Sequence, residues 1–383
     1  MKRRIRVLNP NSAWKAGHHV LAAIELVREM HLAGADIHLH LIRSLIDMTD
    51  VPNTATVSRL LRKRGMSWLE DSRRAKTQQN YLDTLQPEDI AWLWPTVSIE
   101  TYREVAKRGN PILMEGINTR IAYSRRILFD TYQREGLTRG SLDEMVAQEE
   151  EMLSLASYFF SPSPLVTEAL LEQGSSFHGQ VLETSYAAEM PDTPNQTRKN
   201  TDNVVVLFIG EDSLRKNVHG LLRAWKKIDP KNATLRLVGQ LDPQVQELCE
   251  AELQMESVET LGYVQNLHAV YRDSDVFIMP SFEEGSPRVT YQAAGYGLPV
   301  IASPMGAGRL ADRNGVIAKV DPFDVDSIAE TLDRFISNAD LRDEYGKRSA
   351  EISPDYTWRS VGRDRFAQLC EIFGAQNIQQ VSN

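Results

Sequence analysis

A short stretch between residues 276 and 302 combines the residue types that bind phosphate and sugar hydroxyls. The apolar run at its start predicts a strand, an acidic loop containing Glu284 follows, and Ser286 and Pro287 predict the start of a helix. Serine is a favoured N-cap, and proline suits the first helical position. Because a helix N-terminus attracts anions and a carboxylate binds hydroxyl groups, we expect a ligand that carries both, as a nucleotide sugar does. An ordinary βαβ unit with a solvated loop acid would give the same pattern.

A second phosphate signal lies between residues 204 and 223, where a strand pattern ends at Gly210 and Asn217 is a good N-cap for the next helix. Arg215 and Lys216 stand immediately before that cap. Cations at a helix N-terminus oppose the macrodipole by ~0.3–1 kcal/mol each, which a bound anion would offset. The arginine fork and the lysine point charge suit a diphosphate, although a solvated basic loop would also account for them. Both signals follow strands of one predicted sheet, so the two sites are expected to converge on one ligand.

Strand and helix patterns alternate along the whole chain, which predicts parallel sheets covered on both faces. The expected fold is α/β, with two Rossmann-like doubly wound domains facing across a cleft. Strands are expected at residues 5–8, 36–41, 90–94, 111–114, 158–161, 204–210, 235–239, 258–264, 276–280, 299–302 and 315–318.

The chain becomes polar and proline-bearing after residue 187, which indicates a linker. We therefore expect an N-terminal, acceptor-side domain over residues 1–190, a linker over 191–203 and a nucleotide-sugar-binding domain over 204–355. The amphipathic pattern within residues 356–383 predicts a last helix that docks back on the first domain. Ligands of such folds bind outside the carboxyl ends of the strands, here between the domains.

Composition excludes several function classes. A chain of 383 residues is long enough for two domains, and its formal charge of −9 argues against a general nucleic-acid binder. Cys249 and Cys370 have no CxxC spacing, so a disulfide framework or zinc site is not expected. The histidines show no metal-ligand spacing, so no metal and no cofactor is expected. The apolar runs are too short for a signal peptide or a membrane span, and a cytoplasmic protein is expected.

A predicted helix over residues 56–83 carries a local excess of cations in an otherwise acidic chain. Its cation-rich part, residues 59–76, could contact an anionic membrane surface from the cytoplasmic side or a phosphate-bearing acceptor. A solvated helix face is the commoner explanation of such a run. We interpret Glu149-Glu150-Glu151 as a solvated helix face too, and residues 306–311 as a loop despite their formal match to a dinucleotide fingerprint.

The C-terminal half resembles family 4 glycosyltransferases of the GT-B fold, also called glycosyl transferases group 1. The resemblance covers most of residues 200–375 and rests on several segments, which are Gly210 to Lys216, LGYV (261–264), YRDSDVFIMPS (271–281), EEGSPRVTYQAAGYGLPVIAS from Glu283, and DPFDVDSIAETL (321–332). It implies a retaining, metal-independent enzyme that uses a nucleoside diphosphate sugar.

The resemblance also assigns roles to individual residues. In the family, a glutamate that contacts the sugar matches Glu284, and the acid eight positions later, which holds the ribose, is replaced by Gln292. Lys216 matches the phosphate-binding lysine, and Arg215 takes the place of an arginine that often follows the glycine. The segment that ends at Val264 lies where the family seats the base.

The N-terminal half resembles the family less closely. It has NPNSAWKAG where many relatives have two glycines, and no histidine follows the fourth strand. The acceptor-side candidates at these places are Asn11, Gly17, Asn118 and Thr119.

These inferences lead to one expected function, transfer of a hexose from a nucleoside diphosphate sugar to a hydroxyl of a glycan, lipid-linked or small-molecule acceptor, in polysaccharide, lipopolysaccharide or glycolipid assembly. The expected catalytic residues are Glu284, Lys216 and Arg215. The expected donor-binding residues are Gly210, Arg215, Lys216, Val264, Glu284, Gly285, Ser286, Pro287, Arg288, Val289 and Gln292. A catalytically silent nucleotide-sugar-binding paralogue and a GT-B nucleotide-sugar epimerase remain as alternatives.

Overall fold

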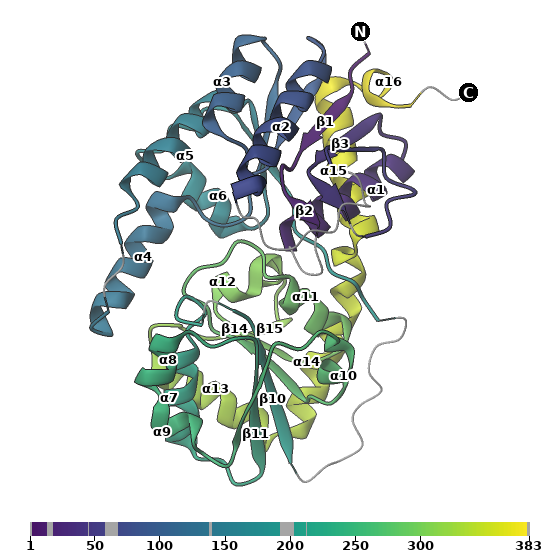
Figure 1. Cartoon of the computed structure of the whole chain (residues 1–383). Coiled ribbons are helices and arrows are strands. Elements are labelled where there is room, and N and C mark those ends of the chain that lie inside the picture. Colours follow the sequence, from purple (N-terminus) through teal and green to yellow (C-terminus); the bar gives the residue numbers. More distant parts are fainter. Residues whose placement is uncertain are drawn as a thin grey trace.

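The structure is a computed structural model, and it describes residues 2–13, 18–44, 46–57, 68–137, 140–191, 203–211 and 213–380. Two parallel sheets, each flanked by helices, form two layered α/β bodies, one above the other in Figure 1. The expected fold of two Rossmann-like domains is therefore confirmed.

The N-terminal sheet has seven parallel strands in the order β5-β3-β1-β6-β7-β8-β9. These strands are β1 (Ile5–Leu8), β3 (Ile37–Leu41), β5 (Asn53–Ala55), β6 (Ile90–Leu93), β7 (Ile112–Glu115), β8 (Tyr158–Ser161) and β9 (Gln180–Glu183). The helices of this half are α1 (His18–Leu32), α2 (Trp68–Thr84), α3 (Ile99–Lys107), α4 (Ile121–Arg134), α5 (Asp143–Leu155) and α6 (Pro164–Leu171). A small separate ladder joins β2 (Ser12–Ala13) to β4 (Arg43–Ser44).

The C-terminal sheet has six parallel strands in the order β12-β11-β10-β13-β14-β15. They are β10 (Val204–Ile209), β11 (Ala233–Val238), β12 (Val258–Gly262), β13 (Val276–Met279), β14 (Val300–Ala302) and β15 (Ile317–Lys319). The helical elements are α7 (Val218–Ile228), α8 (Pro243–Leu248), α9 (Glu250–Leu253), α10 (Leu267–Arg272), α11 (Arg288–Gly295), α12 (Pro304–Ala307), η1 (Gly308–Asp312), α13 (Val325–Ser337), α14 (Ala339–Ile352) and η2 (Ser353–Tyr356). Both β10 and β13 are buried along their whole length, as central strands of a doubly wound sheet must be.

The last helices, α15 (Trp358–Phe373) and α16 (Ala375–Ile378), return to the N-terminal body. Helix α15 packs along α1, and Figure 1 shows it rising from the lower to the upper body. Its Arg365 is fully buried and contacts the Glu115 carboxylate at the end of β7 at 2.9 and 3.0 Å. Arg365 also donates to the Thr184 hydroxyl and the Ser185 carbonyl, which lie on the segment leaving the first domain. We call residues 184–191, which leave the first domain, the interdomain segment. The buried ion pair holds this segment and α15 against the carboxyl end of the first sheet.

Several expectations need correction. Residues 306–311 lie in α12 and η1 rather than a loop, because Ser303 caps α12 by accepting from the Gly306 N–H. The expected helix over residues 56–83 begins too early, because residues 56 and 57 are bends that follow β5. Its described helical part is α2, and residues 58–67 lie outside the described residues. Strand β9 was missed because only one of its four residues is buried, which leaves no apolar run to find.

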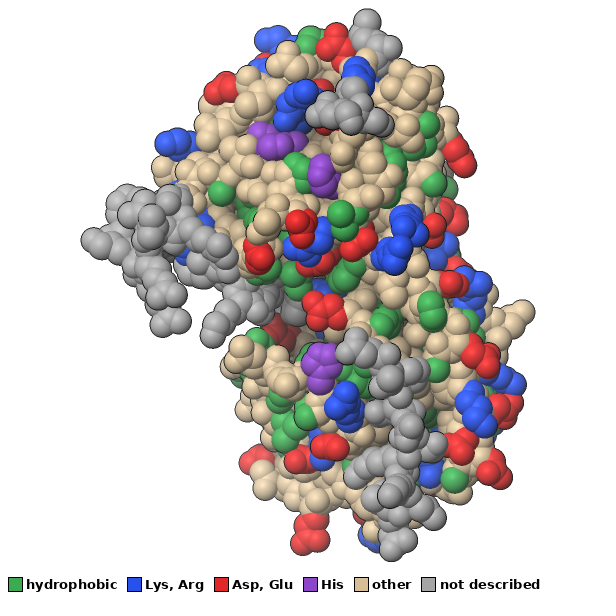
Figure 2. Space-filling model, turned by 90° about the vertical axis from the view of Figure 1, so that its right-hand side faces the viewer, with side chains coloured by type: hydrophobic (Ala, Val, Ile, Leu, Met, Phe, Trp, Pro, Cys, Tyr) green, Lys and Arg blue, Asp and Glu red, His purple; other side chains and the backbone are tan. Residues whose placement is uncertain are grey.

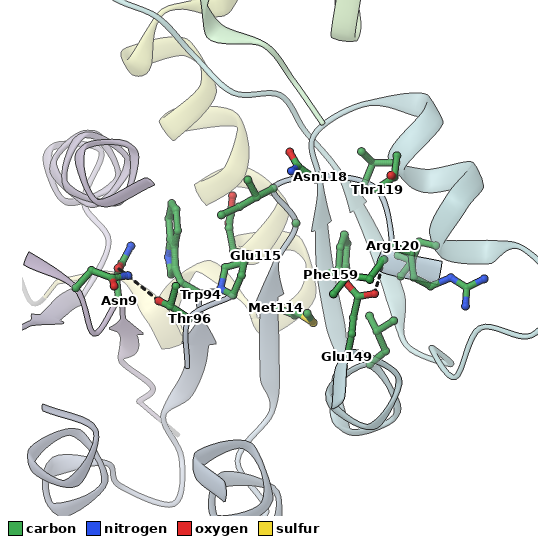
Figure 3. A pocket seen from close by; sticks show the side chains of 18 residues that line it. Asn9, Trp94, Thr96, Met114, Glu115, Asn118, Thr119, Arg120, Glu149 and Phe159 are labelled. Atoms are coloured by element: carbon green, nitrogen blue, oxygen red, sulfur yellow. Dashed lines mark hydrogen bonds between the residues drawn. The ribbon is translucent and has the colours of Figure 1, made fainter. Parts of the chain in front are cut away.

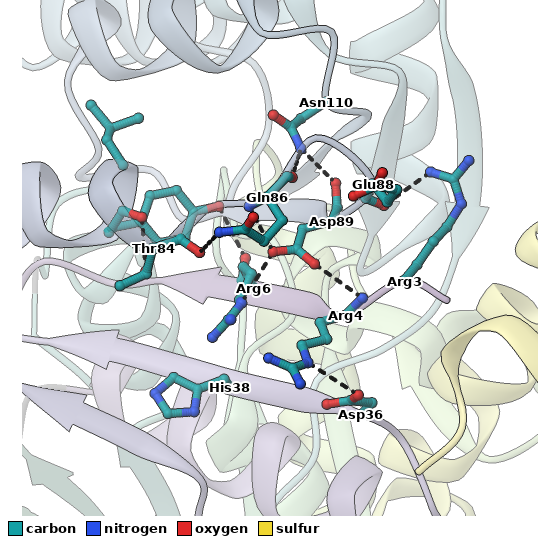
Figure 4. A network of polar contacts seen from close by, with 12 residues as sticks. Arg3, Arg4, Arg6, Asp36, His38, Thr84, Gln86, Glu88, Asp89 and Asn110 are labelled. Atoms are coloured by element: carbon teal, nitrogen blue, oxygen red, sulfur yellow. Dashed lines mark hydrogen bonds and ion pairs between the residues drawn. The ribbon is translucent and has the colours of Figure 1, made fainter. Parts of the chain in front are cut away.

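The basic residues at the N-terminus stabilise the opposite end of the first sheet, away from the carboxyl ends of the strands (Figure 4). The Asp89 carboxylate accepts from the Arg4 N–H and from the Arg6 guanidinium, both at 3.3 Å, and Arg4 also pairs with Asp36. On the face shown in Figure 2, basic and acidic side chains are interspersed. Among the described residues, no helix combines the length and apolarity needed to cross a bilayer.

Candidate active site

The loop after β10 wraps a lysine across a glycine. Gly210 follows the strand, and a Cβ at this position would lie 2.4 Å from Cδ of Lys216, so a larger residue here would displace the lysine stem. Asn217 adopts a left-handed conformation with φ of 59° and caps α7 by accepting from the Gly220 N–H at 3.2 Å, as predicted. The loop therefore delivers Arg215 and Lys216 to the carboxyl end of the sheet.

Four charged side chains meet between the loops that follow β10 and β13. Arg215 Nη1 lies 3.2 Å from the Glu283 carboxylate and 3.4 Å from that of Glu284, and Lys216 Nζ donates to Glu284. Burial raises the pKa of Glu284, but the charges of Lys216 and Arg215 outweigh burial and leave this pKa lowered. In Glu283 burial dominates over Arg215, so its pKa is raised. The cluster places two cations and two carboxylates where sequence reasoning expected a diphosphate and sugar hydroxyls.

The same cluster contacts the first domain. Glu283 Oε1 accepts from the Thr119 N–H at 3.1 Å and from the Thr119 hydroxyl at 2.7 Å. Next to it, Gly285 abuts the loop after β7 so closely that a Cβ would lie 1.6 Å from the Ile117 carbonyl oxygen. Thr119 is thus held against the donor-side loop, and the two loops close one side of the space between the domains.

The start of α11 differs from the expected one. The helix begins at Arg288, Pro287 occupies the N-cap position, and no side chain caps it. The Ser286 hydroxyl instead lies 2.6 Å from that of Tyr291 and accepts from the Tyr186 N–H, because tertiary partners from the interdomain segment compete for it. Arg288 Nε likewise donates to the Ala187 carbonyl at 3.2 Å. The side chains of Ser286 and Arg288 therefore anchor the helix start to that segment.

Of the remaining donor-side candidates, Val289 and Gln292 lie on α11 and Val264 follows β12. Gln292 accepts from the Tyr271 hydroxyl at 3.2 Å, and this hydroxyl also lies 3.2 Å from the Val289 carbonyl. Tyr271 is fully buried and stacks on Tyr296 with ring centres 4.9 Å apart. Val264 follows β12 and is half-buried.

Three of the four acceptor-side candidates border one cavity, and the fourth lies outside the described residues. Asn11 and Asn118 line a cavity in the first domain, which Thr119 also borders, whereas Gly17 lies outside the described residues. Asn11 donates to Asn9 and to the Thr96 hydroxyl, and its carbonyl oxygen accepts from Arg74 of α2 at 3.4 Å. Part of the cation-rich stretch 59–76 therefore touches the acceptor side, while residues 58–67 are among those not described.

Sequence reasoning missed Glu283, because the motif singles out its neighbour Glu284. Thr119 was an acceptor-side candidate, but no local sequence signal predicts its contact with Glu283. Glu149 and Glu150 were interpreted as solvated, but Glu149 Oε2 accepts from the Ile121 N–H at 2.5 Å and Glu150 pairs with Arg120 and accepts from the Ser176 N–H. The Glu151 side chain, 40% exposed and paired with Arg103, lies at the surface as expected.

Residues 189–352 match the family described as "Glycosyl transferases group 1". An uncharacterized glycosyltransferase of Methanocaldococcus jannaschii is 30% identical over 174 residues, which are 43% of this chain and 44% of that protein. An amylovoran biosynthesis glycosyltransferase of Erwinia amylovora is 28% identical over 156 residues, 39% of this chain and 44% of that protein. The matched part thus spans less than half of these relatives.

Solved structures with the same fold cover nearly the whole chain. Sucrose-phosphate synthase from Thermosynechococcus elongatus superimposes with a TM-score of 0.73 at 17% identity, covering 98% of this chain and 100% of that one. WaaG, a glycosyltransferase involved in lipopolysaccharide biosynthesis, gives a TM-score of 0.66 at 12% identity and covers 95% and 99%. At these identities the likeness establishes the GT-B fold.

Proposed function

We propose that this chain, a protein of the GT-B fold whose residues 189–352 match the group 1 glycosyltransferase family, moves a sugar from a nucleoside diphosphate sugar to a hydroxyl acceptor with retention of configuration. The observation that carries the proposal is the meeting of Arg215 and Lys216 with Glu283 and Glu284 at the carboxyl ends of β10 and β13. Both cations lie on one short loop, so one diphosphate can contact both.

The proposed reaction uses these side chains in distinct ways. The bond between the anomeric carbon and the diphosphate oxygen breaks, and the acceptor oxygen bonds to the same face of the sugar while its proton passes to the donor phosphate. Arg215 and Lys216 stabilise the negative charge that grows on the leaving diphosphate, which is the largest expected electrostatic contribution. Glu284 leaves Lys216 when the diphosphate binds and accepts hydrogen bonds from the sugar hydroxyls. No step of this scheme needs a metal ion or a cofactor.

The acceptor is proposed to be a glycan or a glycolipid. Two similar proteins are named as glycosyltransferases of amylovoran biosynthesis and of lipopolysaccharide biosynthesis. We propose that the acceptor approaches from the first domain, where Asn11, Asn118 and Thr119 border one cavity.

Incubation of the full chain with a panel of nucleotide sugars and glycan acceptors tests this function. Release of free nucleoside diphosphate together with a glycosylated acceptor is the expected result. Conversion between nucleotide sugars would identify an isomerase instead, and thermal stabilisation without turnover would identify a silent binding protein. Lys216→Ala should lower product release, which excludes a contaminating activity.

A further inference from the structure

The wall of the cavity in the first domain combines apolar and polar side chains. The cavity measures about 270 Å³, and residues that follow β1, β6 and β7 are part of its wall. Six of its eighteen lining residues are apolar side chains that are at most 5% exposed, namely Trp94, Met114, Leu153, Phe159, Val166 and Leu170. Figure 3 shows Trp94 on one side of it and Phe159 on the other, with Met114 between them. Such a lining favours a ligand with an apolar body.

Two polar groups of the cavity wall have unused hydrogen-bonding capacity. One oxygen of Glu149 accepts from the Ile121 N–H, and the other has no partner among the described residues. Trp94 is fully buried, and its indole N–H has no partner in the described part of the chain. Burial raises the pKa of Glu149 to about 7, so its carboxylate gains most from a hydroxyl that donates to it. A ligand that supplies both an acceptor and a donor would satisfy these groups.

Charge disfavours an anionic ligand here. Arg120 is the single cation among the described residues that line the cavity, and its guanidinium is already engaged by Glu150 and Glu172 and by the carbonyls of Ala169 and Gly174. A phosphate placed beside Glu149 would meet a carboxylate without a free cation to offset it.

The cavity adjoins the proposed donor site through one loop. Residues 116–121 form part of its wall, Ile117 touches Gly285, and Thr119 donates to Glu283. A molecule bound in the cavity therefore lies beside the carboxylates that face Arg215 and Lys216.

We propose that this cavity binds the acceptor through an uncharged, apolar group, with Glu149 accepting from a hydroxyl and the Trp94 indole N–H donating to an oxygen of the same molecule. The inference rests on the proposed glycosyl transfer and specifies its acceptor class. A sugar phosphate acceptor is excluded by it, and a glycoside or glycolipid with an apolar group next to the sugar is favoured.

Calorimetry at pH 8, where Glu149 is ionised, tests the proposal without a donor. The probes are phenyl and methyl glycosides of glucose, galactose and mannose, together with glucose 6-phosphate. For at least one sugar the phenyl glycoside should bind about tenfold or more tightly than the methyl glycoside, because the ring buries apolar surface. Glu149→Gln, which keeps side-chain shape, and Trp94→Phe, which removes the indole N–H, should each weaken that binding about three- to tenfold.

Matched controls separate binding from folding. Glu144→Gln changes an exposed carboxylate of the same helix, and Trp358→Phe removes another buried indole N–H without a described partner, outside the cavity. Both should bind the phenyl glycoside as the parent does, and circular dichroism should show all four variants folded. Tightest binding of glucose 6-phosphate, equal binding of phenyl and methyl glycosides, or affinities unchanged by Glu149→Gln and Trp94→Phe would each overturn the proposal. Titration with nucleoside diphosphates stays an independent test, so a failure here is distinguishable from a failure of the transferase function.

Discussion

Replacing Lys216 by alanine should weaken nucleoside diphosphate binding by an amount that the site geometry bounds. The ammonium is largely buried, since its side chain is 11% exposed, and it contacts the Glu284 side chain, which is 7% exposed. Its stem lies beside Gly210, and the truncation removes both this stem and the charge. Arg215 remains 3.4 Å from Glu284 and keeps that carboxylate partly compensated.

The expected loss of affinity depends on the contact with Glu284 that Lys216 gives up when it binds phosphate. A hydrogen bond to a charged group contributes about 1.5–3 kcal/mol. Because Lys216 gives up Glu284 when it contacts phosphate, the lower half of this range applies, and about 1.5–2 kcal/mol corresponds to roughly 10- to 30-fold weaker binding. An exposed lysine such as Lys226, 56% exposed and paired with Glu252, should matter far less.

Isothermal titration of the parent, Lys216→Ala and Lys226→Ala with the nucleoside diphosphate that binds best provides the assay. Lys226→Ala should match the parent within about twofold, since exposed ion pairs contribute little and this one lies away from the cluster. Equal affinities for the two variants would refute the assignment of the lysine to the diphosphate.

Three further perturbations probe the same region. Glu284→Gln should bind a bare nucleoside diphosphate about three- to tenfold more tightly, because the lysine no longer has to leave a carboxylate. The same variant should lower the rate of sugar transfer about 100-fold or more. Weaker binding of the nucleoside diphosphate would contradict the proposal that Lys216 exchanges Glu284 for phosphate. Gly285→Ala should reduce kcat/KM about 100-fold, because its Cβ would lie 1.6 Å from the Ile117 carbonyl and push the two loops apart, whereas Gly140→Ala, with open space around it, should leave steady-state kinetics unchanged. Glu149→Gln should stabilise the protein by up to about 3 kcal/mol at pH 8 and not at pH 4. Burial raises the pKa of Glu149 to about 7, so folding disfavours its ionised form and the parent loses stability as pH rises from about 4.5 to 7; denaturation curves that show no such pH difference would contradict the buried carboxyl.

The donor-side cluster was predictable because its signals are local. Arg215, Lys216 and Glu284 each follow an apolar strand pattern within a few residues, and the carboxyl ends of parallel strands meet at one edge of the sheet. The N-cap role of Asn217 was likewise predictable from residue type.

Features that depend on distant partners were not predictable. Glu283 contacts Thr119 across 164 residues of sequence, and Glu115 contacts Arg365 across 250 residues. The burial of Glu149 depends on how α4 packs against α5, which a run of three glutamates cannot reveal. Ser286 is a favoured capping residue by type, yet its hydroxyl is engaged by the interdomain segment and Tyr291.

A structure of the full chain with a bound nucleoside diphosphate tests the central claim most directly. We expect the pyrophosphate oxygens within hydrogen-bonding distance of both the Arg215–Lys216 loop and the start of α11, with Glu284 released from the lysine. A pyrophosphate that contacts only one of these two junctions, or that binds elsewhere on the chain, would contradict the account.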